Sequence, residues 1–270
     1  MALPESPGPG RPRKRFGQHF LNDLAVIDRI VSRLFPRPGE VLCEIGPGRG
    51  ALSDRLAICE NELHLVEIDR DLVPRLRERY ASQTNIHIHE QDALTLALEE
   101  IHPTGRVVLV GNLPYNISTA LMIRLLAQRN RIDRMVFMVQ KEVAVRLTAL
   151  PGGKDYGRLT VMMSRVFESE FSFDVDPQAF TPAPKVWSSV VAFKPRPAPL
   201  GPAVAEEAFS ALVRQAFSQR RKTLRNTLKG ICSESVILEA GLDPKVRPEQ
   251  VSVEGFARLA ALNEKDAEAV

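Results

Sequence analysis

Long hydrophobic runs and cysteines are scarce in this 270-residue chain. Its longest apolar runs, such as Val107–Val110 and Met135–Val139, are far too short to span a bilayer, so we expect no transmembrane helix. The cysteines Cys43, Cys59 and Cys232 are scattered and odd in number, which indicates a reducing compartment and no disulfide framework. The sequence therefore predicts a cytoplasmic protein without a membrane segment.

A strong excess of charge of one sign is also absent. The formal net charge is +3, from 36 basic and 33 acidic residues, so charge alone identifies no partner. Hydrophobic residues make up 44% and charged residues 26%, which is ordinary globular usage and excludes a collagen-like or disordered chain. The first fifteen residues have no apolar stretch behind their charges and include Glu5, which argues against an export signal or a transit helix.

Short apolar strands alternate with helical stretches through most of the chain. Apolar residues at helical spacing predict a helix over Asn22–Leu34. Two later runs without a clear helix between them, Leu159–Val166 and Val190–Phe193, predict an antiparallel pair of strands at one edge. Five earlier buried-type runs predict a parallel sheet covered on both faces: Val41–Ile45, Leu63–Ile68, Ile86–His89, Val107–Val110 and Met135–Gln140.

The proline-dense segment Lys194–Pro202 is the best candidate for a domain boundary. We expect a flexible basic leader over 1–15, a catalytic α/β domain over 16–199 and a helical domain over 200–270, where no strand pattern appears. A length of about 150 residues per domain also predicts roughly two domains.

Three closely spaced glycines, Gly46, Gly48 and Gly50, follow the first strand of the predicted sheet. Glycine permits a tight turn and lets a ligand approach the backbone, although an ordinary strand-to-helix turn has the same composition. No Lys-Ser/Thr pair follows, so the loop is not a phosphate cradle. A nucleoside without phosphates, such as S-adenosylmethionine, fits this loop better than ATP or NAD.

Two acidic residues follow the next two strands. Glu67 ends the second strand, where nucleoside-binding sheets place the acid that accepts both ribose hydroxyls. Asp92 lies just past the third strand, where a carboxylate can accept a hydrogen bond from an adenine amino group. Either acid alone would be an ordinary surface residue, but with the glycine loop they place a ligand at the carboxyl ends of three strands.

The fourth strand ends in Asn112-Leu113-Pro114-Tyr115. The side-chain oxygen of Asn112 and the backbone carbonyl of Leu113 can accept hydrogens from a planar amine. Pro114 stiffens the turn, and Tyr115 can stack on a base. This arrangement would aim the amine's lone pair at a methyl donor without a strong general base. The competing interpretation is a proline turn with a core tyrosine.

With these motifs the chain resembles the KsgA-type (RsmA) small-subunit ribosomal RNA adenine N6,N6-dimethyltransferases. The resemblance implies a Rossmann-like methyltransferase fold with a mostly parallel seven-stranded sheet, a small C-terminal helical domain, S-adenosylmethionine and no metal. The matching segments run from residue 13 to 226 and are RKRFGQHFL from Arg13, Glu44–Gly50, Glu67–Asp69, Gln91–Ala93, Gly111–Thr119, Gln140–Glu142, Tyr156–Leu159, Phe180–Ser188 and Arg220–Asn226.

The same resemblance assigns further residues. It implies a contact with the methionine end of the cofactor from position 19 and Leu21, where the family often has asparagine at position 19 and this chain has His19. It also implies cofactor binding by Asn112 and a second aromatic wall for the target base from Phe180, for which a core phenylalanine is the competing interpretation. The implied substrate is a pair of adjacent adenosines in a hairpin loop near the 3′ end of 16S rRNA, methylated in ribosome biogenesis.

The stretch from Arg214 to Lys229 contains six basic residues and no acidic residue. On one continuous helix, all but one of them would share a sector of roughly 100° beside an apolar stripe. A solvated helix face is the plainer interpretation, but the unmixed sign favours RNA phosphates. With two leader residues, the expected RNA-binding set is Lys14, Arg15, Arg214, Arg220, Arg221, Lys222, Arg225 and Lys229.

Two other functions remain possible on the sequence alone. One is a large-subunit rRNA dimethyltransferase of the macrolide-resistance type, and the other is a non-catalytic RNA-binding assembly or transcription factor. His87 and His89 share one strand face, but with no clear third ligand an exposed face is a simpler interpretation than a metal site. Nothing in the sequence predicts a dimer interface, so we expect a monomer.

Overall fold

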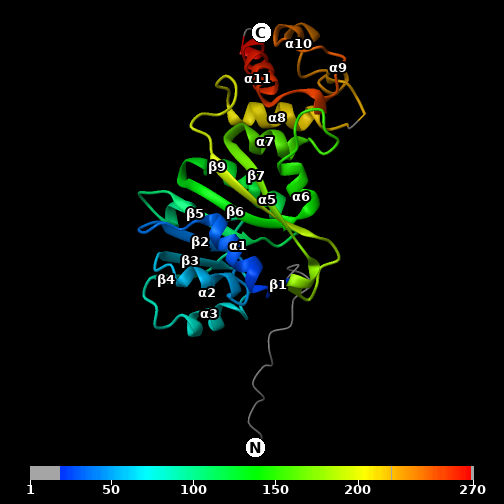
Figure 1. The fold of residues 1–270 in the computed structure, drawn as a ribbon. Coiled ribbons are helices and arrows are strands. Elements are labelled where there is room, and N and C mark those ends of the chain that lie inside the picture. Colours follow the sequence, from blue (N-terminus) through cyan, green and yellow to red (C-terminus); the bar gives the residue numbers. More distant parts are fainter. Residues whose placement is uncertain (1–18, 220, 269–270) are drawn as a thin grey trace, which may run out of the picture. The chain divides into compact units, whose positions relative to one another are not determined.

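A computed structural model describes residues 19–219 and 221–268 of the chain. Seven strands form one sheet in the order β4-β3-β2-β5-β6-β9-β7 (Figure 1). Within this part of the chain, no helix has the length and apolar character needed to cross a membrane. The strands of the sheet are β2 (Val41–Ile45), β3 (Glu62–Glu67), β4 (Ile86–Glu90), β5 (Val107–Asn112), β6 (Ile132–Gln140), β7 (Phe167–Val175) and β9 (Ser188–Pro195).

The first five strands of this sheet confirm the sequence prediction. The pairs β2–β3, β2–β5, β3–β4 and β5–β6 are all parallel. The helices between these strands are α2 (Ala51–Ala57), α3 (Val73–Arg79), α4 (Leu98–Ile101) and α5 (Ser118–Leu126). Because β2 is central and its neighbours run parallel to it, the carboxyl ends of β2, β3, β4 and β5 meet at one edge.

The predicted N-terminal helix is α1 (Leu24–Leu34). Asp23 begins it as an N-cap, because its side chain accepts hydrogen bonds from the N–H groups of Ala25 and Val26. The buried face of α1 includes Ile27 and Ile30, which pack in the core cluster that also contains apolar residues of β2, β3 and β5.

The prediction of a strand over Leu159–Val166 is wrong. These residues form helix α7 (Arg158–Val166), which begins after the extended Gly157, and strand β7 follows it directly. The helix is buried on most of its surface, including its polar residues Thr160 and Arg165, so its polar residues do not mark a solvent-exposed face. The strand signal lies in FESEFSFDV, where apolar residues alternate from Phe167 to Val175. The edge of the sheet thus pairs β9 with β7 and leaves 159–166 outside it.

Residues 206–268 confirm the expected helical C-terminal region. It contains α8 (Glu206–Ala216), α9 (Leu224–Thr227), α10 (Glu234–Glu239) and α11 (Val253–Glu268). The single basic helix expected over 214–229 is wrong, because α8 ends at Ala216 and α9 begins only after Thr223 in an extended conformation. The calculated sector of roughly 100° therefore does not apply to these residues.

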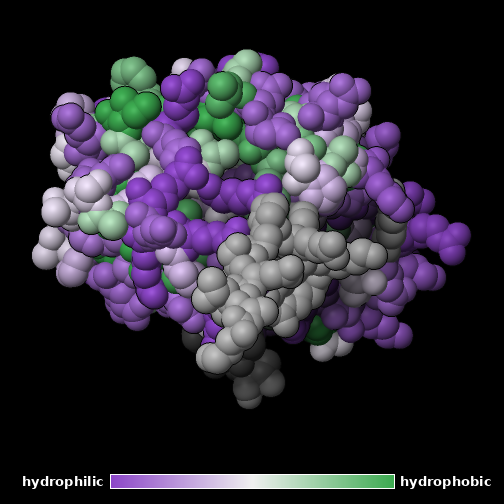
Figure 2. Space-filling view, turned by 90° about the horizontal axis from the view of Figure 1, so that it is seen from below, coloured by the Kyte–Doolittle hydropathy of each residue, from purple (hydrophilic) through white to green (hydrophobic). Residues whose placement is uncertain are grey.

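Contacts divide the chain into two compact units. Of the described residues, one unit takes in those up to Arg124, together with Asn130–Lys141 and Ser172–Ala192. The other takes in Leu125–Arg129, Glu142–Phe171 and the described residues from Phe193 onward. The expected division at residues 199 and 200 stays a prediction. On the face drawn in Figure 2, hydrophilic residues predominate and hydrophobic ones form small groups, as expected when most apolar side chains are in cores.

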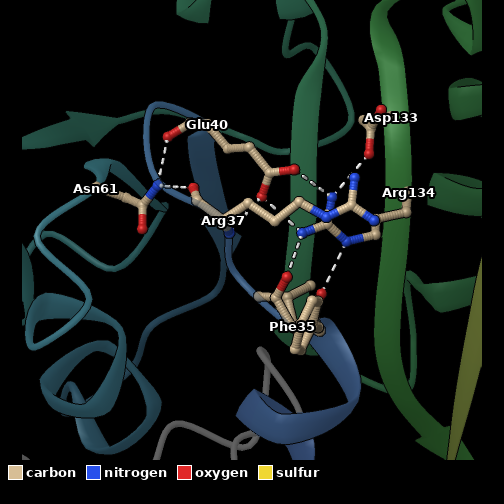
Figure 3. A network of polar contacts seen from close by, with 7 residues as sticks. Phe35, Arg37, Glu40, Asn61, Asp133 and Arg134 are labelled. Carbon is tan, nitrogen blue, oxygen red and sulfur yellow. Dashed lines mark hydrogen bonds and ion pairs between the residues drawn. The ribbon is translucent and has the colours of Figure 1, made fainter.

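Arg134 on β6 joins the end of α1 to the start of β2 (Figure 3). Its Nε and Nη2 donate to the carbonyls of Leu34 and Phe35 at 2.7 and 2.8 Å, at the helix end where carbonyls lack intrahelical donors. Its two terminal nitrogens also donate to the two carboxylate oxygens of Glu40, each at 2.7 Å. Asp133 accepts a further bond at 2.7 Å. One guanidinium therefore satisfies several acceptors that a lysine could not reach together.

We expect Arg134→Lys to lower the free energy of unfolding by about 1–3 kcal/mol, because the ammonium leaves helix-end carbonyls and one Glu40 oxygen without donors. Urea unfolding measures this change, with Arg77→Lys on the exposed face of α3 as the matched control. Equal stability of the two variants would contradict the assigned role.

The same pair predicts a pH dependence. The hydrogen bond from Arg134 holds the pKa of Glu40 below its ordinary value of 4.5. A carboxyl whose pKa is lower in the folded state contributes stability above its unfolded-state pKa and loses it as the pH falls through the folded-state value. The destabilisation caused by Glu40→Gln should therefore be largest near neutral pH and shrink below about pH 4.5. A constant effect in urea unfolding across this range would argue against the pair.

Candidate active site at the carboxyl ends of the parallel strands

A cavity of about 320 Å³ opens at the edge where β2, β3, β4 and β5 end. This volume is within the usual range for small-molecule sites. Strand β1 (Phe20–Leu21), which pairs antiparallel with β8 (Phe180–Thr181), contributes another wall. Most of the predicted site residues line it: His19, Leu21, Gly46, Gly48, Glu67, Asp92, Asn112, Leu113, Pro114 and Tyr115.

The glycine loop after β2 has the backbone that the sequence predicts. Gly46 and Gly48 have φ values of +69° and +60°, which side-chain-bearing residues rarely adopt. A Cβ on Gly48 would lie 3.1 Å from the Phe20 ring, so a side chain there would crowd the wall of the cavity. Gly50 does not line the cavity but begins α2, and an added Cβ would lie 2.9 Å from the Tyr80 hydroxyl.

Glu67 ties this loop to the end of β3. Its two carboxylate oxygens accept from the N–H groups of Gly48 at 3.0 Å and Asp69 at 2.9 Å. Burial raises the pKa of Glu67, while these backbone donors oppose the rise. A carboxylate accepts about four hydrogen bonds in all, so Glu67 can hold the loop and still accept from a ligand.

Asp92 follows β4 and is half-buried at the cavity. Its Oδ1 accepts from the N–H of Leu94 at 2.9 Å, which fixes the rotamer. The second oxygen has no such bond in the described structure, so the carboxylate can accept a hydrogen bond from a ligand amine.

Glu44 is a lining residue that the sequence reasoning missed. It is buried in β2, and Ser53 donates to its Oε2 at 2.6 Å. Burial raises the pKa of Glu44 to about 8. An acid inside the otherwise apolar strand VLCEI was the available signal. The carboxylates of Glu67 and Asp92 make the cavity favourable for a cationic ligand and unfavourable for phosphates, whereas the raised pKa leaves Glu44 mostly neutral at pH 7.

Asn112 is held at the end of β5 by one half of its amide. Its Nδ2 donates to the backbone carbonyl of His19 at 2.9 Å, and among the described residues no donor contacts the side-chain oxygen, which can accept from a ligand. The N–H of Leu113 donates to the carbonyl of Met138 at 3.0 Å, and Pro114 accepts from the first N–H groups of the following turn. The tetrapeptide is therefore fixed by backbone bonds from both sides.

Tyr115 is positioned through its hydroxyl. The hydroxyl oxygen lies 2.6 Å from that of Ser188 on β9, and burial raises the pKa of Tyr115. The ring centroid of His19 lies 5.5 Å away, tilted by 30°. A His19 ring nitrogen lies 2.8 Å from the Pro182 carbonyl, so this residue is held on both sides although the related family often has asparagine there.

Lys141, in the Gln140–Glu142 segment, is linked to both neighbours of Ser188, directly to Trp187 and through Asp174 to Ser189. Its backbone N–H donates to the carbonyl of Trp187 at 2.9 Å, and its ammonium lies 2.6 Å from Asp174. Asp174 in turn accepts from the hydroxyl of Ser189 at 2.6 Å. The two contacts of Lys141 itself join residues more than thirty positions apart, so sequence reasoning could not assign Lys141 this role.

Phe180 is 3% exposed and belongs to the core cluster that contains Leu21. It does not line the cavity, and its expected stacking on a base stays a prediction. The expected RNA contacts Arg214, Arg221, Lys222, Arg225 and Lys229 lie in the described part of the chain, and all five are exposed. Lys14, Arg15 and Arg220 lie outside the described residues.

Comparison with known proteins agrees with the motifs. A family model described as "Ribosomal RNA adenine dimethylase" matches residues 10–265. "Ribosomal RNA small subunit methyltransferase A" of Nitrosococcus oceani is 48% identical, over 92% of this chain and 95% of that protein. The protein of the same name from Chromobacterium violaceum is 47% identical, over 92% and 94%.

Solved structures confirm the predicted fold. The 23S rRNA methyltransferase ErmE is 30% identical, covers 91% of this chain and 99% of its own length, and has a TM-score of 0.69. A dimethyladenosine transferase from Plasmodium falciparum shares the fold at 23% identity and a TM-score of 0.77, over 93% and 99%. The chain belongs to the ribosomal RNA adenine dimethylase family, in its small subunit methyltransferase A group.

Proposed function

We propose that this chain dimethylates N6 of two adjacent adenosines in a hairpin loop near the 3′ end of 16S rRNA. The main supporting observation is that the Asn112 amide is held in one orientation by its bond to His19. Asn112 lines the same cavity as Glu67 and Asp92. A nucleoside-binding wall and an acceptor for an amine thus share one site.

S-adenosylmethionine fits the chemistry of this cavity. Glu67 would accept the ribose hydroxyls, Asp92 the adenine amino group, and His19 and Leu21 would contact the methionine end. The acids Glu67 and Asp92, which line the cavity, suit a ligand that carries a sulfonium and an ammonium group. When bound, S-adenosylmethionine supplies an electrophilic methyl group.

Asn112 and Tyr115 would orient the acceptor base. The Asn112 oxygen and the Leu113 carbonyl can accept hydrogens from the adenine amine, which directs its lone pair, while the Tyr115 ring stacks on the base. Both side chains are fixed by partners outside the tetrapeptide, so little rotamer entropy is lost when the base binds. This positioning requires no general base, because the amine's proton can leave to solvent after transfer.

The basic residues between Arg214 and Lys229 would contact RNA phosphates. Such contacts give affinity that falls with salt but carry no base sequence. Selection of the target then depends on RNA shape and on extrusion of an unstacked adenine.

The two alternative functions are less well supported. The small-subunit relatives reach 48% identity, whereas the 23S rRNA methyltransferase ErmE is 30% identical. A non-catalytic factor has no need for the oriented Asn112 amide or for acids at three strand ends.

Methyl transfer from labelled S-adenosylmethionine tests the proposal. We expect dimethyladenosine, identified by nucleoside mass spectrometry, in unmodified small-subunit particles and not in 23S rRNA or DNA. Asn112→Ala should lower the rate by at least about a hundredfold, since it removes the positioning acceptor.

The matched control is Asn130→Ala, an exposed asparagine outside the cavity, which should retain full activity. Label in 23S rRNA would assign the chain to the resistance type. RNA binding with no label in any substrate would overturn the catalytic proposal.

A further inference from the structure

Four polar side chains gather on β3 and β4, away from the cavity. Glu62 and His64 are two residues apart on β3, and His87 and His89 are two apart on β4. The parallel register places His64 directly beside His87. The sequence pattern of His87 and His89 lacked a third metal ligand; in the structure β3 places two candidate ligands, Glu62 and His64, beside His87.

The distances within this cluster suit a small divalent cation. The Oε1 of Glu62 lies 3.1 Å from His64 Nε2 and 3.6 Å from His87 Nε2. All three ligand atoms lie within 4.8 Å of one another. Zinc binds nitrogen and carboxylate oxygen at about 2.0–2.2 Å, so two ligand atoms of a tetrahedral site are separated by about 3.3–3.5 Å. The two separations from Glu62 bracket that value, and side-chain adjustment would bring the third, between the two histidine nitrogens and at most 4.8 Å, to the same range.

His89 orients the buried ligand. Its Nε2 lies 2.9 Å from His64 Nδ1, and the two rings are stacked with an interplanar angle of 14°. When His64 Nδ1 donates to His89, the lone pair of His64 Nε2 points to Glu62 and His87. A hydrogen bond to the second ring nitrogen is the arrangement that fixes metal-ligating histidines in proteins.

The cluster is also accessible. The side chain of His64 is only 7% exposed, while those of Glu62 and His87 are 50% and 44% exposed. An ion would thus have one deep ligand, two outer ligands and a fourth position open to water. Two imidazoles and one carboxylate are a donor set that zinc accepts and magnesium does not favour.

We propose that Glu62, His64 and His87 bind one Zn²⁺ ion, with His89 as the hydrogen-bonding partner of His64. The ion would tie the edge strand β4 to β3, the two strands whose carboxyl ends lead to Asp92 and Glu67. The site lies near the opposite ends of these strands, so its effect is on stability of the edge and not on methyl transfer chemistry.

Calorimetric titration with Zn²⁺ tests this site, on chain purified without a histidine tag and freed of metal with a chelator. We expect one saturable equivalent, with no binding of Mg²⁺ under the same conditions. His87→Gln and Glu62→Gln should each weaken binding by at least about tenfold, and both change side chains that are about half exposed. Bound Zn²⁺ should raise the Tm of the unaltered chain and not of His87→Gln.

Matched controls are His102→Gln and Glu78→Gln, which lie outside the cluster and should bind Zn²⁺ as the unaltered chain does. Co²⁺ added in place of Zn²⁺ should give the intense visible absorption of a tetrahedral site, which a loosely bound surface ion would not give. Absence of a saturable equivalent, or equal affinity in all four variants, would overturn the proposal.

Discussion

The carboxylate of Glu67 is the contact on which the site depends. It is 5% exposed, and burying an acid is costly unless its oxygens accept hydrogen bonds. The N–H groups of Gly48 and Asp69 meet this need, and in doing so they fix the loop after β2 against the end of β3. The left-handed backbone at Gly46 and Gly48 is what turns the loop toward the acid.

The side chains that would contact the target adenine, Asn112 and Tyr115, are likewise held by residues outside their own segment. Asn112 bonds the carbonyl of His19, which precedes β1, and β1 is held at the cavity by pairing with β8. Tyr115 bonds Ser188, and the contacts of Lys141 with Trp187 and Asp174 support that strand. The groups that would face the adenine are thereby pre-oriented, and positioning can contribute to rate without a catalytic base.

Much of the site could be predicted from short stretches of sequence, because the carboxyl ends of parallel strands meet at one edge of a sheet. The glycine loop, Glu67, Asp92 and Asn112 are each recognised from such a stretch, and all contribute to the cavity. Two predictions of secondary structure were wrong because tertiary packing determines these segments. Helix α7 is buried on most of its surface, and the basic run is divided between α8, which ends at Ala216, and α9, which begins at Leu224. Other features depend on contacts between distant segments. Lys141 reaches Asp174 across 33 positions, and His64 and His87 become neighbours through strand register, which no single-strand pattern contains.

The most direct test concerns the double role of Glu67 as loop anchor and ribose acceptor. Calorimetry should compare the binding of S-adenosylhomocysteine with that of its 2′-deoxyribose analogue, which changes the ligand and leaves the loop intact. The account predicts that the deoxy ligand binds about tenfold more weakly or worse, because a buried carboxylate loses a hydrogen-bond donor. Equal affinities would contradict it, since Glu67 would then be an anchor of the loop alone.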